Sequence, residues 1–364
     1  MKCLMQGCKA PHTASMFATR NDLRSSRTYR RAAAKTMLSF ANVHLGFSAA
    51  KEGPCDIYKA GGTPCVAAHS LTRPLYAAFT GALYQVLRTS DSKTLDIGVA
   101  ASGFADAAAQ DAFCGTSACT VHAIYDQSSK GNHLVVGPPG GAHKEVDREV
   151  NATRSMISIS GHPVYSAVFE GGNGYRTPIG KTNGIAVGDE PESMYAVFAG
   201  KHYNGGCCFD YGNAETDALD DGKGTMEAIY FGNSSGWGHG AGAGPWVMAD
   251  LENGLWAGDK QAMPQAPLVA DFVTAMVKGG AGKFALKGGD AQKDGALATL
   301  YEGVRPDGYN PMNKQGSIIL GIGGDNSDWA IGTFYEGVMT AGYASDATDA
   351  AVHANIVAAG YGLK

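Results

Sequence analysis

Two carboxylates stand close together in the segment PWVMADLENG, which spans residues 245–254. If this segment is a strand, its side chains alternate between two faces, so Asp250 and Glu252 point the same way as Trp246. Like charges two positions apart raise the pKa of one carboxyl and can fit it for acid–base catalysis. Acids on a strand are more often simply solvent-exposed, but the aromatic neighbour on the same face favours a cleft.

Another acid follows the apolar segment IILGIGGDNS, residues 318–327. The two glycines before Asp325 would let another group approach the backbone closely, although an ordinary Asp-Asn turn has the same letters. Glu227 and Glu336 also lie in strand-like segments, and Asp210 follows a pair of cysteines. The sequence alone does not rank these acids against one another.

The chain has eight cysteines, and Cys207 and Cys208 are adjacent in the Gly-rich segment NGGCCFDYGN. Six of the eight lie after residue 52 as three close pairs, which favours disulfides and an oxidising compartment over free thiols. A zinc site is disfavoured, because no C-x2-C pair or histidine cluster lies nearby. Sequons at Asn151 and Asn233 are compatible with secretion. We therefore expect a secreted, disulfide-bonded glycoprotein.

Aromatic residues are interleaved with the acids between residues 203 and 256. A flat apolar face beside carboxylates suits a sugar ring, which offers C–H groups on one face and hydroxyls at its edge, although any one aromatic is more often core packing. The net charge is −5, and residues 1–52 carry +7, which leaves −12 for the rest. An acidic body argues against nucleic acid as a partner and favours a neutral substrate. The aromatics are Tyr203, Phe209, Tyr211, Trp237, Trp246 and Trp256.

Two further motifs do not fit the chemistry that their patterns suggest. The sequence Gly232-x-Ser234-x-Gly236 matches a nucleophile elbow, but the following WGHGAGAG cannot begin the helix that the elbow needs. The segment DALDDGKG, residues 217–224, lacks the third-position ligand of a calcium loop. We therefore expect neither a metal ion nor a cofactor.

The elements that would position these residues are mostly strands. Apolar segments bounded by Gly, Asn or Asp predict strands within residues 193–200, 225–233, 245–258, 271–289, 316–327 and 332–343. Helical spacing predicts a helix within 68–88, a short one at 105–113, and a last one capped by Ser345 or Asp346. Many strands with few helices predict an all-β sandwich with a few short helices, in one domain.

Residues 1–52 differ from the rest by being rich in Arg and Ser and poor in acids. They resemble a basic, apolar, small-residue secretory signal only in part, because Asn42 and His44 interrupt the apolar stretch. We expect a leader or a misannotated extension at 1–52 and the catalytic domain at 53–364. No apolar run approaches the roughly 18 residues of a membrane helix, so no membrane association is expected.

Six longer segments resemble the catalytic domain of fungal-type α-L-arabinofuranosidase B, glycoside hydrolase family 54. In chain order they are GPCDIYKAGGTPCVAAHS, YDQSSKGNHL, CCFDYGNAET, MEAIYFGNSSGWG, PWVMADLENGL and IILGIGGDNS…GTFYEGVMT. The resemblance runs from about Gly53 to the C-terminus. It implies a concanavalin-like, lectin-like sandwich that hydrolyses terminal non-reducing α-L-arabinofuranosyl groups with retention of configuration.

The resemblance also implies roles for individual residues. Glu252 would be the nucleophile and Asp325 the general acid and base, with carboxyl groups roughly 5–5.5 Å apart as in retaining enzymes. The family's sugar contacts map onto Asp250, Asn253, Gly324, Trp237, Cys207 and Cys208. The family's disulfides map onto Cys55–Cys65, Cys114–Cys119 and Cys207–Cys208.

A bond between adjacent cysteines places a demand on the backbone. Disulfides span Cα atoms about 4.4–6.8 Å apart, whereas neighbours across a trans peptide are about 3.8 Å apart. A Cys207–Cys208 bond therefore requires a distorted or cis peptide. Because so small a ring adds little loop-closure stabilisation, we expect it to serve as a rigid apolar surface against the sugar.

The chain departs from the family in two places, and two other functions stay open. The family's C-terminal arabinose-binding domain is expected to be absent after Lys364, and Gly254 replaces a second Asn of the family's catalytic strand. The alternatives are a non-catalytic, lectin-like carbohydrate-binding module, and a related xylosidase or furanosidase activity. The expected partners are arabinose-containing oligo- or polysaccharides, acted on by a monomer.

Overall fold

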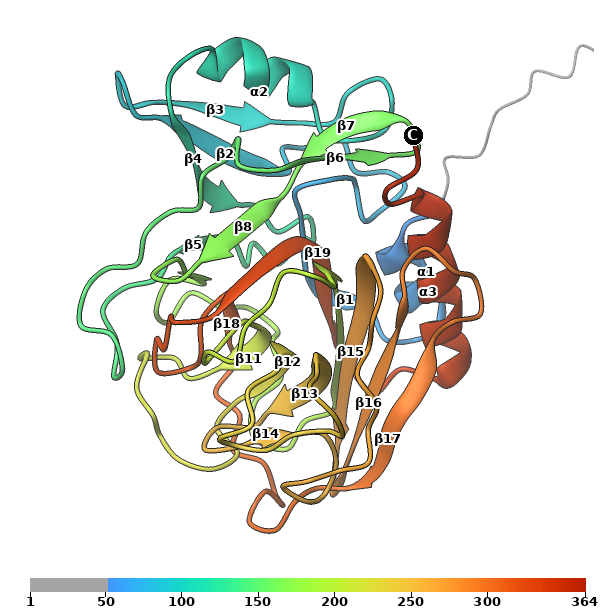
Figure 1. The fold of residues 1–364 in the computed structure, drawn as a ribbon. Helices are drawn as coiled ribbons and strands as arrows, with labels where there is room; N and C mark the ends of the chain where they lie inside the picture. Colours follow the sequence, from blue (N-terminus) through green and yellow to red (C-terminus); the bar gives the residue numbers. More distant parts are fainter. Residues whose placement is uncertain (1–51) are drawn as a thin grey trace, which may run out of the picture. The chain divides into compact units, whose positions relative to one another are not determined.

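The computed structural model describes residues 52–364, shown in Figure 1. The expected leader or extension at 1–52 therefore lies, except for its last residue, outside the described residues. The regular structure of the described chain consists of two large antiparallel sheets, a separate two-stranded hairpin and three helices, joined by long loops.

The first sheet has seven strands. They are β1 (Cys65–Ser70), β8 (Ala167–Glu170), β10 (Glu192–Ala199), β15 (Phe272–Gly280), β16 (Lys283–Asp290), β17 (Ala298–Val304) and β19 (Ile331–Ala341). Their order across the sheet is β1-β19-β10-β15-β16-β17, and β8 also pairs with β19. The strands β15 and β16 form the hairpin that the segment VKGGAGKFAL suggests, with Gly282 at a φ of 70° in the turn.

The second sheet has ten strands. They are β2 (Tyr84–Arg88), β3 (Lys93–Ile97), β4 (Cys119–Ile124), β5 (Leu134–Val136), β9 (Tyr175–Arg176), β11 (Asp210–Ala214), β12 (Glu227–Gly232), β13 (Trp246–Asp250), β14 (Leu255–Trp256) and β18 (Ser317–Leu320). Their order is β14-β13-β12-β11-β18-β9-β5-β4-β2-β3. A separate hairpin joins β6 (Met156–Ile159) to β7 (His162–Tyr165).

The two sheets stack face to face, with β12 and β13 packed against β15 and β16, as Figure 1 shows. In β13 the alternation expected from the sequence is present. Val247 and Ala249 belong to the main core between the sheets, whereas Trp246 and Met248 belong to a smaller apolar cluster on the opposite face. The fold is therefore the predicted β-sandwich, and its outer face on β13 is partly covered and apolar.

The helices are α1 (Pro54–Ala60), α2 (Ala107–Cys114) and α3 (Asp346–Ala359). The last two confirm predictions, and Ser345 caps α3 by accepting a 3.1 Å hydrogen bond from the N–H of Thr348. The helix predicted within 68–88 is wrong, because β1 and β2 occupy the ends of that segment. All six residues of β1 are buried against β19, so strand pairing overrides the helical spacing. Among the described residues, no helix is long and apolar enough to cross a bilayer.

Three disulfides join Cys55 to Cys65, Cys114 to Cys119, and Cys207 to Cys208. The adjacent pair has a cis peptide bond and a Cα–Cα distance of 2.9 Å, as the geometric argument required. The other two close short loops beside α1 and α2.

Candidate active site

A pocket of about 150 Å³ opens on the outer side of the ten-stranded sheet, where β13 ends and the loop after β18 begins. Every residue expected to bind sugar or to catalyse lines it. Its walls are formed by Ala142, Cys207, Cys208, Asp220, Trp237, Asp250, Glu252, Asn253, Gly254, Leu255, Gly323, Gly324, Asp325, Ser327 and Trp329.

Glu252 does not continue the strand, which corrects the expectation that it shares the alternation of β13. The strand ends at Asp250, whose Oδ1 accepts a 3.1 Å hydrogen bond from the N–H of Glu252. Glu252 and Asn253 then adopt positive φ values of 62° and 57°. Such values are uncommon for residues other than glycine and often mark functional sites. The turn, rather than the strand pleat, directs the Glu252 carboxyl into the pocket.

Two contacts hold this turn from outside. The hydroxyl of Tyr309 donates to the carbonyl oxygens of Glu252 and Asn253, at 2.9 and 3.0 Å. The side-chain amide of Asn253 donates to Asp220 Oδ1 at 2.8 Å. The conformation of the turn is therefore fixed before any ligand arrives.

The loop after β18 carries Asp325, which also lines the pocket. Asp325 Oδ1 accepts a 3.0 Å hydrogen bond from the N–H of Ser327, and its carbonyl accepts one from Ala142 at 2.9 Å. A Cβ on Gly324 would lie 3.0 Å from Glu252 Oε2 and only 1.9 Å from Glu215 Oε2. The glycine therefore provides the close approach to the backbone that the sequence suggested.

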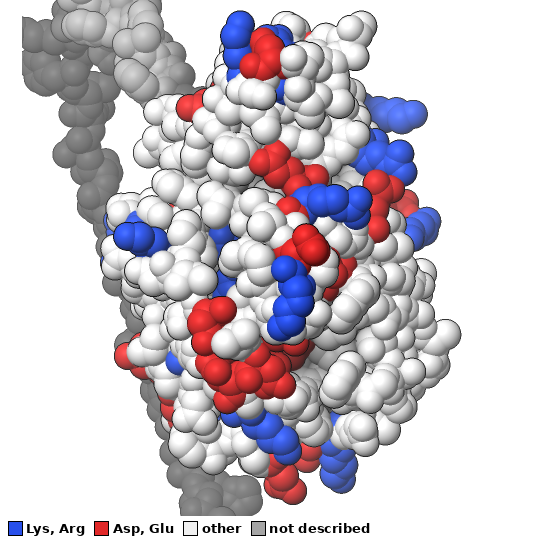
Figure 2. Space-filling view, turned by 90° about the vertical axis from the view of Figure 1, so that its left-hand side faces the viewer, with Lys and Arg blue, Asp and Glu red and all other residues white. Residues whose placement is uncertain are grey.

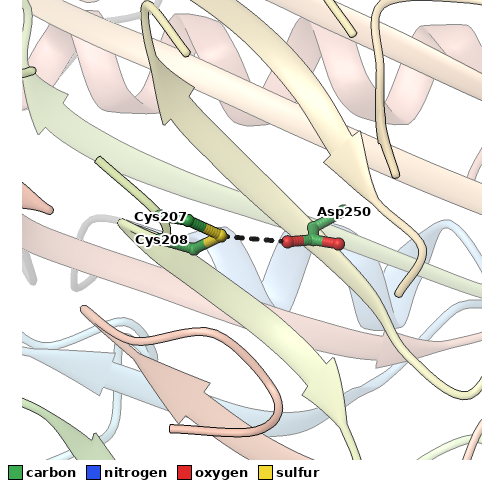
Figure 3. A group of neighbouring side chains, drawn as sticks. All are labelled: Cys207, Cys208 and Asp250. Atoms are coloured by element: carbon green, nitrogen blue, oxygen red, sulfur yellow. Dashed lines mark hydrogen bonds between the residues drawn. A yellow bond between two sulfur atoms is a disulfide. The ribbon is translucent and has the colours of Figure 1, made fainter. Parts of the chain in front are cut away.

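The adjacent disulfide also lines the pocket, and Figure 3 shows it beside the Asp250 carboxyl. Sγ of Cys208 lies 3.3 Å from Oδ2 of Asp250. A disulfide sulfur has no proton to donate, so any hydrogen bond here requires a proton on the carboxyl. The hydroxyl of Ser327 lies 3.7 Å from Sγ of Cys207, so the disulfide also contacts the Asp325 loop.

Electrostatics in the pocket are dominated by uncompensated acids. Burial, and then the charge of Asp250, raises the pKa of Glu252 far above its usual range. Burial raises the pKa of Asp250 to about 7 and also raises the pKa of Glu215. More acids, including Asp220, lie on the loop from β11 to β12, and Asp and Glu side chains gather on that face in Figure 2. These carboxyls cannot all be ionised together.

Two competing acids, Glu227 and Glu336, lie elsewhere and are paired with cations. Glu227 is fully buried and contacts Arg305 at 2.8 Å and Lys314 at 3.1 Å. Glu336, also fully buried, accepts two hydrogen bonds from Arg73 at 2.6 and 2.7 Å. Both acids therefore serve in buried ion pairs.

Two groups of described residues have the composition of metal ligands. In the first, Cys207, Cys208 and Asp250, both sulfurs are bonded to each other, so no thiolate is available. In the second, His143, Asp147 and Asp328, the side-chain amide of Asn326 donates a 3.1 Å hydrogen bond to Asp147 Oδ1. That donor points at an oxygen that a metal would need. Neither group is well suited to a cation.

Comparison with known proteins shows the family to which the chain belongs. Residues 54–362 match the sequence model of the family described as "Alpha-L-arabinofuranosidase B, catalytic". The chain belongs to this family. It is 54% identical to a probable α-L-arabinofuranosidase B of Aspergillus clavatus over 325 residues. The aligned region covers 87% of this chain and 64% of that protein.

Two further relatives of this arabinofuranosidase B family domain extend the comparison. An "arabinofuranosidase/B-xylosidase" of Trichoderma koningii is 54% identical over 319 residues, covering 85% of this chain and 63% of that protein. A crystal structure of an arabinofuranosidase with arabinofuranosyl-α-1,2-xylobiose is 53% identical with a TM-score of 0.82, covering 86% of this chain and 66% of that one. The chain thus spans about 64% of the length of the curated relatives it matches.

The pocket and its surroundings also contain residues that the sequence did not single out. Asp220 lines the pocket and lies in the segment considered as a calcium loop, and Glu215 lies directly after β11, behind Gly324 of the pocket lining. Arg176, fully buried, donates to the carbonyl oxygens of Glu215 and Gly324 and so joins the two walls from below. The only sequence signal for these residues was their nearness to recognised motifs. Their roles depend on contacts between distant segments.

Two tryptophans line the pocket and remain open to solvent. Trp237 is 52% exposed and Trp329 is 59% exposed. The backbone of Trp329 is held on both sides, because its N–H donates to the Cys207 carbonyl and its carbonyl accepts from Asn204. By contrast Trp246, also considered as a sugar contact, is buried in the apolar cluster behind the pocket. An exposed indole on a fixed backbone is typical of a ligand-contacting surface.

Proposed function

We propose that this chain is a retaining, exo-acting α-L-arabinofuranosidase that removes terminal non-reducing α-L-arabinofuranosyl groups from arabinoxylan or arabinan oligosaccharides. The observation that carries the proposal is that Glu252 and Asp325 line one pocket, although they are 73 residues apart in the sequence. A pair of carboxyls in one pocket is what glycoside hydrolysis requires, and the family resemblance favours retention.

In the proposed mechanism, the Glu252 carboxylate attacks the anomeric carbon and forms a covalent bond to it. The glycosidic C–O bond breaks, and Asp325 gives its proton to the departing oxygen. Asp325, now ionised, takes a proton from water as that water attacks the anomeric carbon. The bond to Glu252 breaks, arabinose leaves with its configuration retained, and both carboxyls return to their starting states.

The raised pKa of Glu252 bears on this assignment. On pKa alone, the carboxyl that holds its proton more strongly would be chosen as the acid. The family resemblance instead gives Glu252 the role of nucleophile, and we adopt that role. The positive charge that develops on the sugar ring favours an ionised Glu252 during the reaction. The surrounding acids must therefore retain protons or accept hydrogen bonds for Glu252 to ionise.

The other pocket residues would hold the sugar. Asp250, Asn253 and the Gly324 backbone offer polar groups for ring hydroxyls, while Trp237 and the Cys207–Cys208 disulfide offer apolar surface. Trp329 lies four residues after the general acid, which must face the leaving group. We therefore place the remainder of the oligosaccharide against Trp329.

The test is nuclear magnetic resonance of the first sugar anomer released from an aryl α-L-arabinofuranoside. Release of the α-anomer first, followed by slow mutarotation, is the expected result. Release of the β-anomer would overturn the retaining mechanism and the nucleophile role of Glu252. Absence of hydrolysis with measurable arabinose binding would instead favour the lectin-like module.

A second activity is favoured by one comparison. The Trichoderma koningii relative is named as an arabinofuranosidase and xylosidase, so we propose aryl β-xyloside as a secondary substrate. Competition between the two aryl glycosides at one pocket would be expected.

We also propose that the protein is a secreted, monomeric glycoprotein modified at Asn151 and Asn233. Asn151 is exposed, and its Oδ1 accepts hydrogen bonds from the N–H and hydroxyl of Thr153. Asn233 is half-buried beside the loop that precedes β13. Mass spectrometry of the protein secreted from a eukaryotic host, before and after glycosidase treatment, would test both sites.

A further inference from the structure

One acid beneath the pocket has no role in the mechanism above. Asp210 begins β11 and is fully buried. Neither of its carboxyl oxygens has a hydrogen-bond donor among the described residues. Within residues 52–364, neither Asp210 nor Asp250 belongs to an ion pair with a Lys, Arg or His side chain. A buried carboxyl without a donor or a cation is a costly arrangement if it is ionised.

The side chain that acts most strongly on Asp210 is another carboxyl, that of Asp250, whose Oδ2 lies 3.3 Å from Sγ of Cys208, two residues before Asp210. Asp250 is itself nearly buried, at 6% exposure. Its Oδ1 accepts the N–H of Glu252, and its Oδ2 lies against Sγ of Cys208. Two carboxyls in such contact can form a hydrogen bond only if one of them carries a proton.

The surroundings decide which carboxyl carries it. The charged or titratable groups that face Asp210 are Asp250, Glu252 and Asp325, together with the hydroxyl-bearing Tyr230 on the paired strand. All three acids oppose a negative charge on Asp210. Asp250, in contrast, accepts a backbone N–H, which favours its ionised form.

We propose that Asp210 is a positioning residue that stays protonated as Asp250 ionises and then donates a hydrogen bond to the Asp250 carboxylate. This inference rests on the proposed function, because it gives Asp210 a part in that reaction. The Asp210 proton removes one negative charge from beneath the pocket, so Glu252 can ionise more readily. It also fixes the Asp250 carboxylate, which in turn holds the Glu252 turn through its N–H.

The experiment compares two substitutions of similar shape. Asp210→Asn keeps a donor toward Asp250 without an acidic proton, whereas Asp210→Leu removes the donor. We expect Asp210→Asn to retain kcat/KM within about threefold and Asp210→Leu to lose about tenfold to a hundredfold, the rate equivalent of one lost buried hydrogen bond. The loss should appear mainly in kcat. In the pH profile of Asp210→Leu, the acidic limb should shift to higher pH. Asp307→Asn, an exposed acid, is the matched control.

Infrared difference spectroscopy gives a readout that does not depend on activity. At neutral pH, Asp210→Asn should lose a carbonyl band of a neutral carboxylic acid relative to the wild type, whereas the control Asp307→Asn should leave that band unchanged. Loss of a carboxylate band in Asp210→Asn would overturn the proposal, even if Asp210→Leu does not fold. An equal fall of kcat/KM in Asp210→Asn and Asp210→Leu would also overturn it. If neither the wild type nor the Asp307→Asn control hydrolyses arabinofuranosides, but Asp210→Asn loses the neutral-acid band, the proposed function fails. The protonation of Asp210 then still stands.

Discussion

Two sets of buried acids in the same sandwich have opposite environments. Glu227 and Glu336 project from strands into the interior, where Arg305, Lys314 and Arg73 neutralise them. Asp210, Glu215, Asp250 and Glu252 lie around the pocket without an ion pair to any cation within residues 52–364. The effect on protonation is opposite in sign. Lys314 and Arg305 lower the pKa of Glu227 against the effect of burial, whereas burial and neighbouring acids raise the pKa of Glu252.

The difference shows how the fold separates stability from function. A buried acid with cation partners holds strands together, and its charge is compensated at every pH near neutrality. A group of acids without such partners destabilises the fold and therefore persists only where another requirement maintains it. Substitutions of the ion-paired acids should therefore lower the free energy of unfolding and leave activity unchanged. Substitutions of the pocket acids should lower activity and can raise stability.

The largest effect is expected at the two carboxyls that we propose to be catalytic, Glu252 and Asp325. Asp325→Asn removes the acid and should lower kcat on poor leaving groups by about 10²–10⁴-fold, the usual contribution of general acid catalysis. A nitrophenyl leaving group needs little protonation, so the loss should be smaller there. Glu252→Ala should abolish turnover on both substrates. Steady-state kinetics with aryl and xylobiose-linked arabinofuranosides measures this contrast.

The controls are thermal melts, which should show both variants folded. An Asp325 variant with equal losses on good and poor leaving groups would contradict the acid role. A Glu252 variant that keeps activity on the nitrophenyl substrate alone would mean that the two roles are exchanged.

The next largest effect is a loss of stability, expected for the ion-paired acids Glu227 and Glu336. Glu227→Gln leaves Arg305 and Lys314 with less compensation inside the core, so it should lower the free energy of unfolding by about 3–5 kcal/mol. Urea denaturation at neutral pH provides the measurement. At a temperature where the variant is folded, kcat/KM should equal that of the wild type. A fall in kcat/KM without a fall in stability would place Glu227 in the catalytic machinery instead.

A smaller change in stability, a gain rather than a loss, is expected on substitution of Asp250. Its folded-state pKa is raised to about 7, against an ordinary value near 3.8. The folded protein therefore binds more protons than the unfolded chain between these values, and stability falls as pH rises from about 4 to about 7. Asp250→Asn should flatten that slope and raise the melting temperature at pH 7, although activity is lost.

Melting curves from pH 4 to pH 8 check this, with Asp307→Asn as the exposed control. A steeper slope, or a lower melting temperature at pH 7 than the wild type, would show that Asp250 is compensated like Glu227.

The smallest effect on stability is expected for the adjacent cysteines. Replacing Cys207 and Cys208 together by Ala opens a ring too small to restrict the unfolded chain appreciably, so the melting temperature should stay nearly unchanged. The loss of apolar surface beside Asp250 should raise KM or lower kcat for arabinofuranosides. A large fall in melting temperature with unchanged kinetics would make the disulfide a structural one.

Much of the local structure was predictable from the sequence. The strands around residues 192–199, 227–232, 246–250 and 317–320 follow from apolar segments bounded by Gly, Asn or Asp, and the α3 cap follows from Ser345. The helix predicted within 68–88 failed, because the period of apolar residues there is overridden by pairing with β19. The candidate site was predicted in composition but not in geometry. Glu252 enters the pocket from a turn of positive φ, and neither strand periodicity nor composition indicates such a turn.

The sequence by itself determined which residue types were available: adjacent cysteines, an Asp after two glycines at a strand end, and acids within strand-like segments. Only the tertiary structure decided which acids received cations. Arg305 is 78 residues from Glu227, and Arg73 is 263 residues from Glu336. The environment of a carboxyl depends on the distant segment that packs against it. The same residue type, glutamate, therefore forms a buried ion pair at one position and lines a pocket at another.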